Sequence, residues 1–87
     1  MEGAESAKRA VTAASPGFGS FVANFHTWSI DWAMNVLRDG NPVPGGANTS
    51  TLVFYNGGVY AQDASTKVWW LWDEARLTFM GPVPSPP

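Results

Sequence analysis

The chain has 87 residues, a formal net charge of −2 at neutral pH, no cysteine and 14% aromatic residues. A chain of this length forms one domain that buries only about 60% of its unfolded surface, so large aromatic side chains must supply much of the core. Without cysteine there is no disulfide and no thiolate metal site. The five Lys and Arg residues make no basic footprint for nucleic acid, and no apolar run is long enough to span a membrane.

The two ends of the chain differ in composition from its middle. Residues 1–16 are rich in alanine and are expected to form an N-terminal linker or an edge strand. Residues 81–87 contain four prolines, which favour extended backbone and are excluded from the interior of a sheet. We therefore predict a Pro-rich linker over 81–87 and one folded module over 17–80.

From residue 18 onwards, aromatic residues recur at spacings of three or four, which alone would favour a helix. Glycine, serine and threonine interrupt this stretch and are poor helix formers. The alternation of polar and apolar residues over 27–31 is typical of a strand. We therefore predict strands at 21–23 and 27–31.

The next segment contains the strongest short hairpin signal of the sequence. Residues 36–38 lead into Asp39-Gly40, which favours a two-residue hairpin turn. Residues 41–48 contain two prolines and two glycines and are predicted to be a loop or an edge strand. Residues 76–80 alternate as a last strand.

Residues 52–72 hold six of the twelve aromatic residues and are predicted to form a meander of three antiparallel strands. The strands are separated by a turn at Asn56-Gly57 and a second turn at 63–66. Pairing across the first turn places Tyr55 opposite Gly58, and an even-length second loop, with Gln62 opposite Lys67, preserves the alternation of faces. One face is then apolar and consists of Leu52, Phe54, Val59, Ala61, Val68, Trp70 and Trp72. The other face is mixed and consists of Val53, Tyr55, Tyr60, Gln62, Lys67, Trp69 and Leu71. An odd-length loop would instead exchange Trp69 for Trp70 and Trp72 on the mixed face.

The mixed face is the candidate binding surface, because it sets Tyr55, Tyr60 and Trp69 beside Gln62 and Lys67. Exposed aromatic patches rimmed by polar groups mark binding surfaces. Flat rings with polar neighbours suit pyranose sugars, whose CH-rich faces stack on aromatic rings while their hydroxyls need hydrogen-bonding partners. The alternative is that a second sheet or an N-terminal strand covers this face and makes the rings part of the core.

Trp32 follows the strand 27–31 at the point where the alternation stops. It lies either beside the proposed sugar surface or in the core, and both alternatives stay open. Seven or eight short strands without a clear helix indicate an all-β fold, a small antiparallel β-sandwich of the jelly-roll or immunoglobulin-like kind.

Two segments of the chain together resemble a known class of small β-modules. They are RDGNPVPGG and, about a dozen residues further on, VYAQD with WWLW. Over roughly residues 17–80 the chain is similar to carbohydrate-binding module family 81, whose members are β-sandwiches that bind β-glucans beside a bacterial endoglucanase domain. The resemblance implies a secreted, extracellular module that binds β-1,4- and mixed-linked glucans, such as cellulose, cello-oligosaccharides and xyloglucan. Such a module would target an attached glycoside hydrolase to the plant cell wall.

The sequence offers no convergent set of catalytic groups. A glycoside hydrolase needs two carboxylates about 5 to 10 Å apart across a cleft, whereas Asp39 and Asp63 are explained as turn formers. Asp73-Glu74 is interpreted as a solvated turn in preference to a calcium site, and His26 as a structural imidazole. We therefore expect a monomeric binding module, not an enzyme, with no metal, no cofactor, no nucleic acid and no membrane partner.

In the predicted binding mode, aromatic rings stack on successive glucose units and two polar side chains bind hydroxyls. The candidate residues are Trp69, Tyr60, Tyr55 and Trp32 for stacking, with Gln62 and Lys67 for hydrogen bonding. The alternative function is a protein–protein interaction module that uses the same aromatic face.

Overall fold

The computed structural model describes residues 12–86, and over this range the protein is an all-β domain of nine short strands in two antiparallel sheets. The strand orders are β1-β6-β7-β8-β9 and β2-β3-β4-β5. The strands are β1 Thr12–Ala14, β2 Phe21–Ala23, β3 His26–Ile30, β4 Val36–Arg38, β5 Asn41–Pro42, β6 Thr49–Tyr55, β7 Gly58–Asp63, β8 Trp69–Asp73 and β9 Thr78–Val83. Most of the N-terminal segment 1–16 therefore lies outside the described residues.

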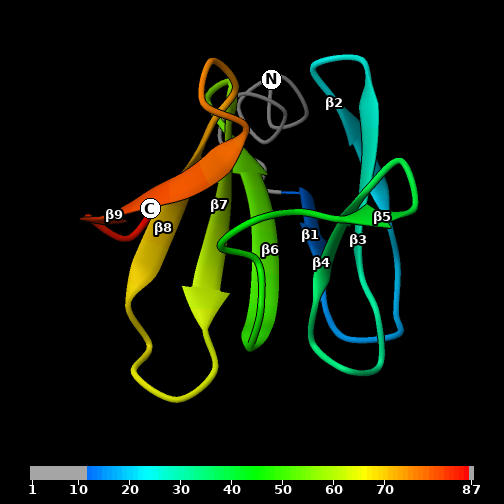
Figure 1. Ribbon diagram of the computed structural model, residues 1–87, viewed down its shortest axis with the longest axis horizontal. Helices are drawn as coiled ribbons and strands as arrows, with labels where there is room; N and C mark the ends of the chain where they lie inside the picture. Colours follow the sequence, from blue (N-terminus) through cyan, green and yellow to red (C-terminus); the bar gives the residue numbers. More distant parts are fainter. Residues whose placement is uncertain (1–11, 87) are drawn as a thin grey trace, which may run out of the picture.

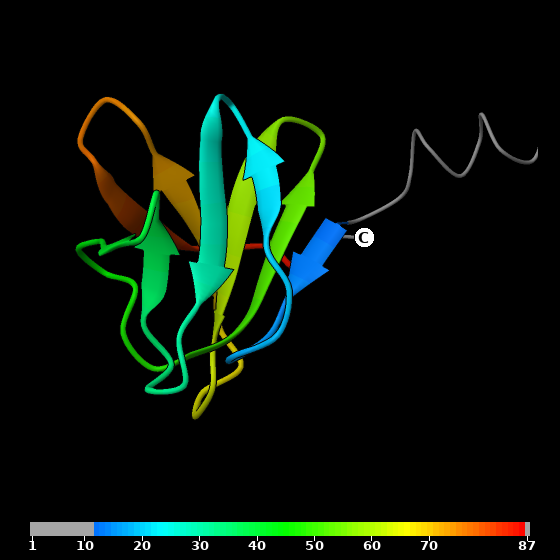
Figure 2. The ribbon, with the colours of Figure 1, turned by 90° about the vertical axis from the view of Figure 1, so that its right-hand side faces the viewer.

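The two sheets face each other in a sandwich-like arrangement. The five-stranded sheet lies on the left of Figure 1 and the four-stranded sheet on the right, and Figure 2 looks onto the four-stranded sheet with the other behind it. Consecutive strands are neighbours in both sheets, except that β1 pairs with β6. The predicted β-sandwich is confirmed, and its strand order is two meanders, which differs from the Greek-key connections of jelly-roll and immunoglobulin folds.

The predicted strands of the first half are present almost as expected. Strand β2 has the predicted bounds, and β3 begins one residue before the predicted strand 27–31. Strands β4 and β5 form the hairpin predicted around Asp39-Gly40. The loop between β5 and β6, which runs in green across the front of Figure 1, then carries the chain to the other sheet.

The last strand begins later and ends later than the predicted strand 76–80. Asp73 Oδ1 accepts hydrogen bonds from the backbone N–H groups of Ala75 and Arg76, at 3.0 and 3.1 Å, which keeps this segment in a turn. Strand β9 then includes Pro82, which a sheet tolerates at an edge because proline has no N–H to donate.

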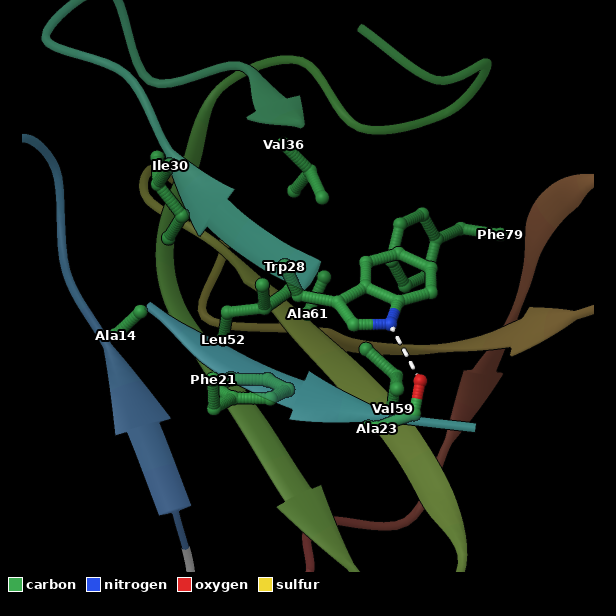
Figure 3. Packing of buried hydrophobic residues seen from close by; sticks show 10 residues of the cluster. All are labelled: Ala14, Phe21, Ala23, Trp28, Ile30, Val36, Leu52, Val59, Ala61 and Phe79. Atoms are coloured by element: carbon green, nitrogen blue, oxygen red, sulfur yellow. Dashed lines mark hydrogen bonds between the residues drawn. The ribbon is translucent and has the colours of Figure 1, made fainter. Parts of the chain in front are cut away.

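The core lies between the sheets and is built around Trp28. This side chain is 1% exposed and its indole N–H donates to the Ala23 carbonyl oxygen at 3.2 Å (Figure 3). Its ring packs edge to face against Trp72 and Phe79, with centroid distances of 5.2 and 6.3 Å. The buried cluster consists of Ala14, Phe21, Ala23, Trp28, Ile30, Val36, Leu52, Val59, Ala61 and Phe79, and Val43, Phe54, Trp70 and Trp72 pack against it.

The first hairpin of the predicted meander has the expected register. Tyr55 pairs with Gly58, and Leu52 pairs with Ala61. The residues predicted for the apolar face of this hairpin all belong to the core or pack against it. Position along the strand thus assigns each side chain to its face.

The second turn of the meander is longer than predicted, and the register there is corrected. Gln62 pairs with Trp69 and not with Lys67. The backbone explains the extra length, because the Asp63 N–H donates to the Val68 carbonyl at 2.9 Å and the Lys67 N–H donates back to the Asp63 carbonyl at 3.0 Å. Strand β8 is displaced by two residues from the predicted pairing. Because side chains alternate between faces, this even displacement leaves each β8 side chain on its predicted face.

Candidate functional site

The predicted mixed face lies on the outer face of the five-stranded sheet. The four-stranded sheet packs on the opposite, inner face, where the core residues gather. Strand β1 extends the five-stranded sheet beside β6, and its Ala13 is exposed. The second sheet therefore does not cover the outer face, and the rings of Tyr55, Tyr60 and Trp69 stand there half-buried.

These three rings follow a diagonal line across three adjacent strands, and we call them the diagonal row. Tyr55 belongs to β6, Tyr60 to β7 and Trp69 to β8. The residue opposite Tyr55 is Gly58, two residues before Tyr60. The residue opposite Trp69 is Gln62, two residues after Tyr60. Each step thus advances one strand and two residues in the same direction, which separates successive residues by about 7–8 Å.

Gly58 makes room for the middle of the diagonal row. A Cβ atom at this position would lie 3.0 Å from Leu71 Cδ1 and 3.3 Å from Tyr60 Cε1. Both side chains therefore lie close to the glycine, where a larger residue would have little room.

The predicted polar partners lie at the Trp69 end of the diagonal row. Gln62 is the direct cross-strand neighbour of Trp69, and its side-chain N–H donates to the Lys67 carbonyl at 3.1 Å. This bond leaves the amide oxygen of Gln62 as an acceptor, while the Lys67 side chain is exposed. Among residues 12–86 no hydrogen bond is formed by the Trp69 indole N–H or by the two tyrosine hydroxyls of the row.

The structure does not bring Trp32 to the diagonal row. Trp32 lies in the turn that follows β3, in the other sheet, and is 73% exposed. Its ring is held edge to face against Phe18, which is 64% exposed, at a centroid distance of 5.2 Å. No local signal in the sequence marks Phe18 as a partner of Trp32, because this contact joins two separate loops.

His26, the first residue of β3, belongs to a polar network with residues at the end of β4 and in the β4–β5 and β8–β9 turns. Its Nδ1 lies 2.6 Å from Asp39 Oδ2, and its Nε2 lies 2.8 Å from Arg38 Nη2. Arg38 also donates to Glu74 at 2.5 Å, and its guanidinium lies 5.6 Å from the Trp72 ring centroid. Both imidazole nitrogens thus have partners, as expected of a structural histidine, and the Arg38–Glu74 pair joins the two sheets.

Hydrogen bonding also explains the acidity of Asp39. The side-chain hydrogen bond with His26 is the largest influence, followed by the N–H of Thr27, which donates to Oδ1 at 2.9 Å. Together they lower the pKa of Asp39 below its ordinary value of 3.8. Asp39 is therefore ionised at neutral pH and serves both its turn and this network.

A small pocket, here called the edge pocket, opens between the β5–β6 loop and the ends of β7 and β8. Its volume is about 190 Å³. Trp70 is its half-buried aromatic wall, and Asp63 is its charged group. Sequence reasoning assigned Trp70 to the core and Asp63 to a turn, because only the tertiary fold closes the loop over them. The full lining is Gly45, Ala47, Thr49, Asp63, Trp70 and Phe79.

Among residues 12–86 no cluster of three or more His, Asp or Glu side chains is arranged to hold a metal ion. No helix within that range has the length and apolar character needed to cross a membrane. No family model, curated protein or solved structure matches the chain.

Proposed function

We propose that this domain is a non-catalytic carbohydrate-binding module for β-1,4- and mixed-linked β-glucans. The observation that carries the proposal is the diagonal row on the outer face of the five-stranded sheet. A glucan chain is a linear series of rings with apolar CH faces and hydroxyl edges. A diagonal line of half-buried aromatic rings on the outer face of the sheet matches that form.

The polar groups beside the row suit the hydroxyl edges of the sugars. The amide oxygen of Gln62 accepts a hydrogen bond, and the Lys67 ammonium donates. The hydroxyls of Tyr55 and Tyr60 and the indole N–H of Trp69 add further groups at the ring edges. Both donors and acceptors are thus available along the row, as a polyhydroxylated chain requires.

The proposed setting follows from the resemblance to carbohydrate-binding module family 81. The module would be part of a secreted enzyme and would hold an attached glycoside hydrolase on cell-wall glucan. Tethering of this kind raises the effective concentration of the enzyme on its substrate without any new contact. In this proposal Trp32 takes no part in the diagonal row.

The test is affinity gel electrophoresis through gels that contain barley β-glucan, xyloglucan, xylan or no polysaccharide. The domain should be retarded in one or both glucan gels only. Trp69→Ala and Tyr60→Ala should each weaken glucan binding at least tenfold, which corresponds to about 1.4 kcal/mol.

The matched control is Trp32→Ala, because Trp32 is the exposed tryptophan of the other sheet. This variant should keep full retardation. If Trp32→Ala abolishes binding while Trp69→Ala does not, the diagonal row is not the site. Equal mobility of the wild type in all four gels would instead favour the alternative, a protein-interaction module.

A further inference from the structure

The edge pocket and the diagonal row meet at two consecutive residues of β8. Trp69 ends the diagonal row, and Trp70, the next residue, projects from the opposite face of β8 into the pocket wall. The two sites therefore lie on opposite sides of the same strand. A single chain that follows the outer face does not enter the pocket.

The size of the edge pocket limits its ligand. Pockets for drug-sized ligands measure about 300–1,000 Å³, and this pocket measures about 190 Å³. It therefore takes one six-membered ring. Trp70 offers that ring an indole surface, and Trp70 is fixed in place because it lies against Gly81, where a Cβ atom would come within 2.8 Å of its Cε3 atom.

Asp63 supplies an oriented carboxylate to the pocket. Its Oδ1 accepts the backbone N–H groups of Ser65 and Thr66, both at 2.8 Å. The hydrogen bond from the Thr66 N–H has the largest effect, followed by that from Ser65, and both lower the pKa of Asp63. The carboxyl group is therefore ionised at neutral pH. The Oδ2 atom has only a long contact of 3.5 Å, to the Asn48 amide.

The polar groups around Asp63 include donors as well as acceptors. Next to Asp63, but outside the pocket lining, the Ser65 hydroxyl accepts from the Asn48 amide at 3.0 Å and keeps its own hydrogen to donate. Thr49 Oγ1 donates to the Gly46 carbonyl at 3.0 Å and keeps its lone pairs. An organic cation needs acceptors only, whereas a sugar hydroxyl both donates and accepts. The mixture favours a sugar.

We propose that the edge pocket binds a single terminal pyranose unit of a β-glucan, stacked on Trp70 with two hydroxyls on Asp63. This inference rests on the proposed function, because it assigns the same class of ligand to a second site. The domain would then bind chain interiors on the diagonal row and chain ends in the pocket.

The test uses cellobiose and amide NMR spectra of the whole domain, in which each of the five tryptophans gives an indole N–H signal. Cellobiose should shift the Trp70 signal, identified with Trp70→Phe. Asp63→Asn keeps an acceptor for the turn but removes the charge, and it should weaken cellobiose binding at least tenfold while leaving retardation in glucan gels unchanged.

The matched control is Asp73→Asn. Asp73 caps the β8–β9 turn in the same way, with its Oδ1 bonded to the N–H groups two and three residues later, but it is outside the pocket lining. This variant should bind cellobiose like the wild type.

Three outcomes would overturn the inference. Equal cellobiose binding by Asp63→Asn and the wild type, with the Trp69 signal shifting in place of the Trp70 signal, would show that only the diagonal row binds sugar. A Trp70 shift with tetramethylammonium but not with cellobiose would make the pocket a cation site. If the wild type binds neither cellobiose nor any glucan gel, the proposed function itself is wrong, and the inference fails with it.

Discussion

Trp69 and Trp70 are consecutive residues of β8, both half-buried, and they belong to different parts of the molecule. Trp70 packs against the core between the sheets. Trp69 stands on the outer face, opposite Gln62 of β7. The side-chain chemistry is identical, so the face of the strand alone separates a structural tryptophan from a candidate ligand-binding one.

The largest expected effect comes from removing a ring of the inner face. Trp72 packs edge to face against both Trp28 and Phe79, with centroid distances of 5.2 Å in each case. Trp72→Ala should lower the free energy of unfolding by about 3 kcal/mol, because it leaves a cavity that the sandwich cannot close. Urea unfolding measured by circular dichroism would show this loss, and a loss below about 1 kcal/mol would contradict the assignment of Trp72 to the core.

A smaller effect on stability is expected from the corresponding change on the outer face. Trp69→Ala should cost about 1 kcal/mol or less, because its ring is only half-buried and makes no ring contact with other aromatic residues of 12–86. The same urea experiment applies. If Trp69→Ala destabilises the domain as much as Trp72→Ala, its effect on glucan binding cannot be separated from unfolding.

The smallest effect concerns the polar network that contains His26 and Asp39. The pKa of Asp39 is lower in the folded state than in the unfolded chain, so its contribution to stability is present above the ordinary value of 3.8 and is lost as the pH falls through the lower folded value. The stability difference between the wild type and Asp39→Asn should therefore shrink as the pH falls from about 5 towards the lower folded value. Unfolding free energies measured across this range would check it, and a difference that does not change with pH would contradict it.

Much of the fold follows from local signals in the sequence. The hairpin turns at Asp39-Gly40 and Asn56-Gly57 are present, and the alternation of the meander assigned its faces correctly. The register after Asp63 was predicted two residues short. The side chain and backbone of Asp63 organise a turn, and the length of this turn depends on which N–H groups donate to Asp63. A sequence pattern does not encode that choice.

Alternation along the strands also predicted part of the candidate site. The three rings of the diagonal row were assigned to one face by alternation, but their straight line depends on the register that was corrected. Trp32 and the edge pocket depend on loops that meet only in the folded domain. Strand periodicity gives information about a face and none about contacts between distant loops.

The strand order also bears on how the domain folds. Neighbours in each sheet are mostly consecutive in the chain, so most pairings close short loops at small entropic cost. The pairing of β1 with β6 is different, because Thr12 and Phe54 are about forty residues apart. Pairings between distant segments form slowly. We therefore expect the two meanders to form first and β1 to join the sheet late, as a short strand on an edge that the other pairings have already built.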